Sequence, residues 1–135
     1  MQFDIAEILC RSLENMGCTG EHFEFDAHST IEIGLENLPS LFISVIDERV
    51  WLWSRLTWMS NDTLITWGGE LWLELQEALP SVVTGQPVLG HGEEGYELKA
   101  LIDEGCFQQE TGLDELLESF FLLCQRLQER FSRLG

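Results

Sequence analysis

Apolar residues recur at helical spacing near both ends of the chain. Between residues 4 and 16 they fall every three or four positions, which predicts an amphipathic helix with Asp4 as its N-cap and Gly17 just beyond its end. Between residues 113 and 134 the same spacing predicts a long final helix, which Thr111 and Asp114 would cap. The stripe of this last helix favours a core face, although a coiled-coil seam would share its spacing.

The spacing changes to two between Glu21 and Leu56, as in strands with one buried face. One strand is expected around residues 31–35, and residues 41–46 and 50–56 predict an antiparallel hairpin. If Asp47 and Glu48 form its loop, one face of the hairpin is aliphatic and carries Leu41, Ile43, Val45, Val50 and Leu52. The other face carries Phe42, Trp51 and Trp53. A loop longer by one residue would exchange the faces of Val50 and Trp51.

A second helix is predicted for residues 61–79, because apolar residues recur there on more than one face until Pro80. Gly68 and Gly69 would each cost about 1 kcal/mol in its interior. Either another helix approaches closely there, or the helix begins after Gly69. Beyond Pro80, glycines and a proline predict a hairpin of residues 82–89 and 96–102. The two apolar faces of this helix suggest a homodimer whose twofold contact includes Trp67, Leu71, Trp72 and Leu75.

One layer of helices covers only one face of a sheet, so the aromatic face of the first hairpin should remain open. Each large aromatic side chain can bury about 150 to 250 Å². Three of them make a patch on the order of 450 to 750 Å², at or beyond the largest that a typical monomer leaves exposed. We therefore expect a partner to bind across Phe42, Trp51 and Trp53 and along the neighbouring strand with Ile31, Ile33 and Leu35.

Charge narrows the choice of partner. The 135 residues suffice for a single domain, and 24 acidic against 7 basic residues give a formal net charge of -17. Such a chain repels phosphate backbones and anionic membrane surfaces, so we expect neither nucleic-acid binding nor membrane insertion. No apolar run has the length of a membrane span, and the first residues do not resemble a signal peptide. Solubility alone would also explain the charge. A more specific alternative explanation is that the acidic surface mimics a nucleic acid.

Residues with catalytic or metal-binding chemistry are few and scattered. The four cysteines form no CxxC pair, which favours reduced thiols without metal. His22 and His28 lie near Glu24 and Asp26 at strand spacing, which matches no known ligand motif, and His91 lies between two glycines at an expected hairpin tip. No nucleophile motif or phosphate-binding loop is present. We therefore expect no catalytic residues, no metal and no cofactor, and a binding protein rather than an enzyme.

Several short segments, taken in order, resemble the class IB type III secretion chaperones of the InvB/SpaK family. They extend over nearly the whole chain, and their number and order make the resemblance specific, since none is a catalytic signature. The sequence differs from the family's pattern between Thr57 and Trp72 and between Pro80 and Gly92. The similar segments are residues 4–7, 17–18, 26–31, 38–40, 43–45, 50–53 and 98–101.

The resemblance implies an α+β domain over residues 1–135, in the order α-β-β-β-α-β-β-α, that forms a homodimer in the bacterial cytoplasm. It also implies a function without ATP. The protein would hold the N-terminal segment of one or more secreted effectors in an extended, secretion-competent state, and the secretion ATPase or sorting components would be further partners. The main alternative is an acidic adaptor or inhibitor of one folded protein, including a nucleic-acid mimic. A small enzyme ranks behind both.

Overall fold

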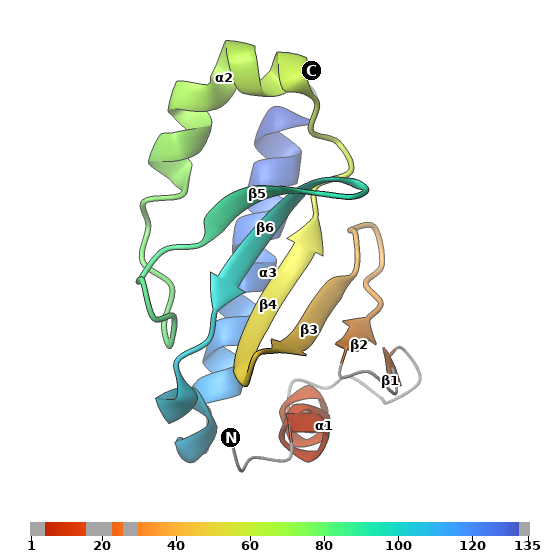
Figure 1. The fold of residues 1–135 in the computed structure, drawn as a ribbon, viewed down its shortest axis with the longest axis vertical. Helices are drawn as coiled ribbons and strands as arrows, with labels where there is room; N and C mark the ends of the chain where they lie inside the picture. The colour runs from red at the N-terminus through yellow and green to blue at the C-terminus, as the bar shows by residue number, and fades with distance from the viewer. Residues whose placement is uncertain (1–4, 16–22, 26–29, 133–135) are drawn as a thin grey trace.

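The computed structural model describes residues 5–15, 23–25 and 30–132 (Figure 1). The helices are α1 (Ile5–Asn15), α2 (Asn61–Glu74) and α3 (Gly112–Phe131), with a short 3-10 helix η2 (Glu104–Gln108) before α3. The strands are β1 (Phe23–Phe25), β2 (Thr30–Ile33), β3 (Leu41–Ile46), β4 (Arg49–Arg55), β5 (Val88–Gly92) and β6 (Gly95–Leu101). The predicted α+β class and the order of its elements are confirmed, with β1 as an additional strand.

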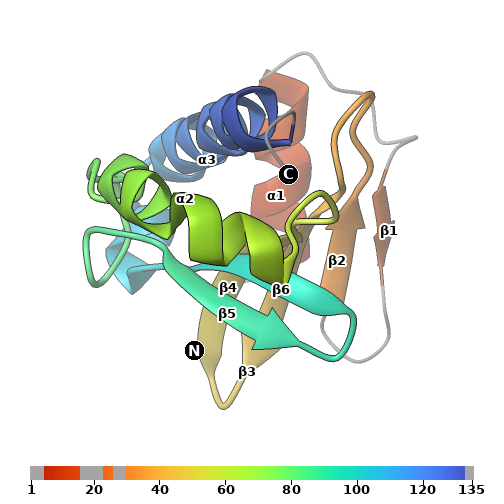
Figure 2. The ribbon, with the colours of Figure 1, turned by 90° about the horizontal axis from the view of Figure 1, so that it is seen from above.

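All six strands form one antiparallel sheet in the order β1-β2-β3-β4-β6-β5, so β1 and β5 are its edges. The helices pack on one side of it, as Figure 2 shows for α1 and α3. The core lies between these layers, where side chains such as Leu52, Leu98 and Phe120 are completely buried. We call this side of the sheet the inner face and the opposite side the outer face.

The register of the β3–β4 hairpin is the predicted one. Ile46 pairs with Arg49, so the loop is Asp47 and Glu48, and both have a positive φ (51° and 64°) as a two-residue type I′ turn requires. Ile43 is paired with Leu52 on the inner face, and Phe42 with Trp53 on the outer face. The separation of aliphatic from aromatic side chains is therefore confirmed.

Two predicted boundaries were wrong. Helix α2 ends at Glu74 instead of residue 79, and the chain after Leu75 continues as turns over the same core, in which Leu75 and Leu79 are buried. The second hairpin begins at Val88 instead of residue 82, and Val82 forms only an isolated bridge to Ile102. In both places apolar residues are buried, but their spacing did not predict that they lie outside the helix and the hairpin strands.

The ends of the helices also differ in part from expectation. Ser60 caps α2, where its Oγ accepts from the backbone N–H of Thr63 at 3.2 Å, and α2 runs without interruption through both glycines, so a start after Gly69 is wrong. At α3 the Thr111 side chain makes no bond to the helix backbone and donates to Glu115 instead. Thr111 is the N-cap residue, as predicted, but its side chain makes no capping hydrogen bond. The caps proposed at Asp4 and Gly17 lie outside the described residues.

Candidate functional site

The outer face of the sheet carries a fixed aromatic cluster. The rings of Phe42 and Trp53 stack with centroids 4.3 Å apart and planes 18° apart. Trp53 Nε1 donates to Ser44 Oγ at 2.9 Å, and the Arg55 guanidinium lies over both rings, 4.9 Å from Phe42 and 5.3 Å from Trp53. Arg55 is in turn ion-paired with Glu94 of the β5–β6 turn at 2.8 Å. These contacts hold the Trp53 ring in one orientation, so a partner would meet a preorganised surface.

Beside this cluster lies a pocket of about 360 Å³, which we call the outer-face pocket. Its apolar wall comes from Ile46, Trp51 and Trp53, and no helix of the described chain covers it. Its polar groups already have partners, because Ser44 accepts from Trp53 and Glu97 is ion-paired with Lys99 at 3.2 Å. The pocket therefore suits an apolar side chain better than a charged one, which would lose hydration without gaining a free partner. Its lining residues are Ser44, Ile46, Trp51, Trp53, Glu97 and Lys99.

The structure separates the six residues that we expected to contact an effector. Trp51 and Trp53 line the outer-face pocket, and Phe42, which is only 7% exposed, stacks against the Trp53 ring. Ile31 and Ile33 point into the core, and Leu35 packs against it, so their side chains cannot form part of the outer face. That part of the prediction was wrong, because on β2 the outer face belongs to Thr30 and Glu32, opposite Ser44 and Phe42.

Four pocket residues were missed: Ser44, Ile46, Glu97 and Lys99. Ser44 and Ile46 could have been found from the sequence, since they alternate with the core residues of β3 exactly as Phe42 does. Glu97 and Lys99 could not, because their place beside Trp53 depends on β6 pairing with β4 across a helix and a long connection.

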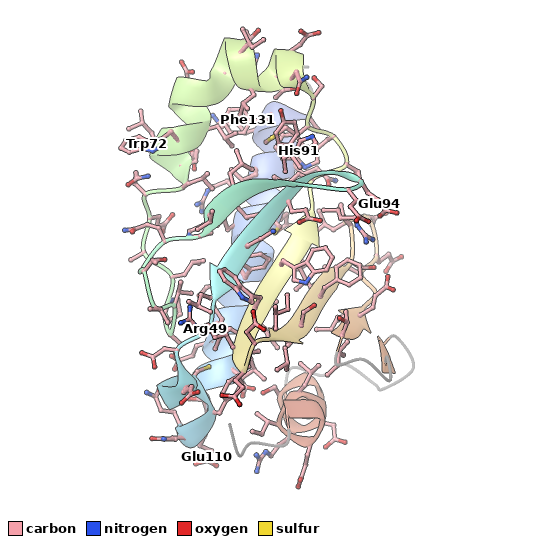
Figure 3. All side chains as sticks on the ribbon, viewed as in Figure 1. Arg49, Trp72, His91, Glu94, Glu110 and Phe131 are labelled. Carbon is pink, nitrogen blue, oxygen red and sulfur yellow. The ribbon has the colours of Figure 1, made fainter. Side chains whose placement is uncertain are left out.

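Helix α2 presents a second apolar surface, on its solvent side. Of the four residues expected at a dimer contact, Leu71 and Leu75 are buried in the core, so their assignment to the surface was wrong. Trp67 is partly buried and packs against the core. Trp72 is 60% exposed and points away from the sheet (Figure 3). It follows Ile65, which is 81% exposed, at a spacing of two helical turns, with Gly68 and Gly69 between them. We call Ile65, Gly68, Gly69 and Trp72 the α2 stripe.

The described residues contain no group of three side chains that could hold a metal ion. His91 is exposed on β5 and makes an edge contact with Tyr96, with ring centroids 4.9 Å apart. His22 and His28 lie outside the described residues. Among the described helices, none is both long and apolar enough to span a membrane.

Cys106 and Cys124 are buried free thiols. Burial raises the pKa of Cys124 from 9.0 to about 12 and also raises that of Cys106. Since only the thiolate reacts readily, we expect both to resist a thiol reagent in the native protein. Titration should count at most two reactive thiols before unfolding and four after it, without reductant. Fewer than four after unfolding would contradict the prediction of reduced thiols.

The raised pKa of Cys124 also sets a dependence of stability on pH. The unfolded chain, with the lower thiol pKa, loses this proton first as the pH rises. The contribution of Cys124 is therefore fully present below pH 9 and is lost between pH 9 and about 12. Chemical unfolding at several alkaline pH values should show a steeper loss of stability in the parent than in Cys124→Ala.

Fold and surface together define a class of protein: an α+β domain whose helices cover one face of a sheet and whose other face carries an aromatic pocket. The model of the invasion protein B family matches residues 17–93. Two relatives named surface presentation of antigens protein SpaK, from Salmonella typhimurium and Salmonella typhi, are each 33% identical over 119 residues, 87% of this chain and 88% of the relative. The chain therefore belongs to the invasion protein B family, and its resemblance to the InvB/SpaK chaperones of type III secretion is confirmed.

Proposed function

We propose that this protein is a cytoplasmic type III secretion chaperone that binds the N-terminal segment of secreted effectors in extended form. The observation that carries the proposal is the uncovered outer-face pocket, with two tryptophans on its wall, in a member of this family. Binding would bury apolar side chains of an unfolded segment and keep that segment soluble. The protein would require neither ATP nor a cofactor for this step.

The edges of the sheet offer a second kind of contact. β1 and β5 each pair with one neighbouring strand only, so the backbone N–H and C=O groups along their open edges are available for an added strand. An extended segment could gain backbone hydrogen bonds at an edge and bury side chains on the outer face. Such distributed contacts offset the entropy that the effector loses on ordering and tolerate partners of different sequence.

The α2 stripe supports a homodimer as the working form. Two glycines there leave the helix backbone accessible, and a Cβ on either would meet nothing within 4 Å in the same chain. A second copy of α2 could therefore approach closely across a twofold axis. Figure 2 places α2 on the same side of the sheet as α3, so this contact would leave the outer-face pocket of each protomer free. The secretion ATPase or sorting components would be further partners of the loaded dimer.

Co-expression with individual secreted proteins of the same bacterium tests the function. Each candidate would be produced at full length and without its N-terminal region, and complexes would be measured by co-purification and light scattering. We expect stable complexes only when the N-terminal region is present. An acidic adaptor or inhibitor would instead bind the folded remainder of its target, and that result would contradict the chaperone proposal.

A further inference from the structure

Two glycines of β5 lie beside the outer-face pocket. Gly90 and Gly92 share the outer face with Val88, because Val88 pairs with Lys99 and Lys99 pairs with Trp53. Glycine weakens a strand and often marks a point where another group comes close. Neither residue has a positive φ, so the backbone conformation does not require glycine at either position. At Gly92 the requirement lies instead in the space above the residue.

The side chains of Glu97 and Lys99 fill that space. A Cβ on Gly92 would lie less than 3.0 Å from the Glu97 carboxylate, and a Cβ on Gly90 would contact the Lys99 side chain at 3.5 Å. The two charged side chains form their ion pair here, with 3.2 Å between Lys99 Nζ and Glu97 Oε1. Glu97 is well covered, since only 12% of its side chain is exposed against 37% for Lys99.

We infer that Gly92 is a positioning residue of the binding site, because the absence of a side chain there lets the Glu97–Lys99 ion pair lie over β5 and thereby keeps the outer-face pocket open. The occupant of the pocket, a large apolar side chain of an effector's extended segment, rests on the proposed function. If the Glu97 and Lys99 side chains extended straight out from β6 instead of lying over β5, they would occupy the space beside Trp53 that the occupant should fill. Gly92 thus determines how far this wall extends from the sheet, and the pairing of the two charges keeps the wall electrically neutral.

Gly92→Ala tests the inference without removing any group from the pocket. The atoms that the new Cβ would meet belong to the flexible end of a glutamate, so the chain should fold and Glu97 should move towards β4 and Trp53. The probe is N-acetyl-phenylalaninamide, whose few atoms limit binding to roughly the millimolar range. Its binding would be followed through the indole N–H signals of Trp51 and Trp53 in NMR spectra. We expect roughly fivefold weaker binding to Gly92→Ala than to the parent.

The double variant Gly92→Ala/Glu97→Ala should bind the probe more tightly than Gly92→Ala, because the displaced side chain is gone. Gly105→Ala is the matched control, since its Cβ would make only an ordinary contact of 3.6 Å with Asp103 and its φ is not positive. Equal affinity of Gly92→Ala and the parent, or a double variant as weak as Gly92→Ala, would overturn the inference. Thermal unfolding of each variant separates loss of the pocket from loss of the fold.

The same measurements distinguish this inference from the proposed function. If effectors bind elsewhere, Trp51→Ala will not change the affinity for effectors, while the small probe will still bind Gly92→Ala more weakly than the parent. If Gly92 does not position the ion pair, the probe will bind Gly92→Ala as tightly as the parent, while Trp51→Ala will still weaken effector binding.

Discussion

Replacing Ile65 by glutamate should convert the protein from a homodimer to a monomer. Ile65 lies on the α2 stripe beside Gly68, Gly69 and Trp72 and is 81% exposed in a single chain. In a twofold contact the substitution occurs twice. Each new carboxylate would be buried without a partner, and such burial is strongly unfavourable. Light scattering at micromolar concentration should give about 15.5 kDa for the variant and about twice that mass for the parent.

Leu122→Glu is the matched control, because Leu122 is also an exposed apolar residue, 49% exposed, but lies on α3. It should remain a dimer. Gly69→Ala adds a sharper test, since alanine favours a helix over glycine by about 1 kcal/mol and nothing in the same chain obstructs the new methyl group. A weaker dimer in spite of this gain would place Gly69 at a close contact. A parent protein of 15.5 kDa, or a dimeric Ile65→Glu, would contradict the dimer.

The sequence predicted that α2 has two apolar faces but not which of them meets the core. Leu71 and Leu75 form one face and are buried, whereas Ile65 and Trp72 form the other and are exposed. Both sets follow helical spacing, and tryptophan contributes to cores and to interfaces alike. The rotation of α2 is fixed by tertiary contacts, including ion pairs of Arg126 with Glu74 and Glu77, each 2.8 to 2.9 Å long. These contacts join residues about fifty positions apart, which periodicity cannot relate.

For the β3–β4 hairpin, in contrast to α2, the sequence alone predicted which side chains share each face. Alternation and a two-residue polar loop determine its register locally, so the faces of Phe42, Trp51 and Trp53 could be predicted without knowledge of the other strands. The face of β2 could not be derived in the same way. Its alternation shows that Ile31 and Ile33 share a face, but the pairing with β3 decides that this face is the inner one. The outward-facing side chains were therefore predicted correctly on β4, whereas the residues chosen on β2 face the core.

This division also changes the expected role of Phe42. The ring is 7% exposed and stacks against Trp53, so its removal would leave a cavity within the aromatic cluster. Truncation of a buried phenylalanine typically costs about 3 to 5 kcal/mol of stability. Phe42→Ala should thus lower both stability and binding. Trp53 is also unsuitable for a clean test, since it is joined to Ser44 and Arg55.

Trp51→Ala should weaken the binding of an effector's N-terminal segment by about 1 to 3 kcal/mol, or roughly 5- to 150-fold, with little loss of stability. Trp51 lines the outer-face pocket, is half-buried, and stands opposite Ser44 and Leu101 without belonging to the Phe42–Trp53 stack. Its truncation therefore removes contact area from the pocket and leaves the core beneath the sheet unchanged. Isothermal titration with the purified segment measures the affinity, and thermal unfolding measures the stability. Trp51→Phe should restore most of the affinity, and Leu122→Ala, an exposed apolar control on α3, should have no effect. If Trp51→Ala binds as tightly as the parent, the effector does not use this pocket; if it unfolds, Trp51 contributes to the core.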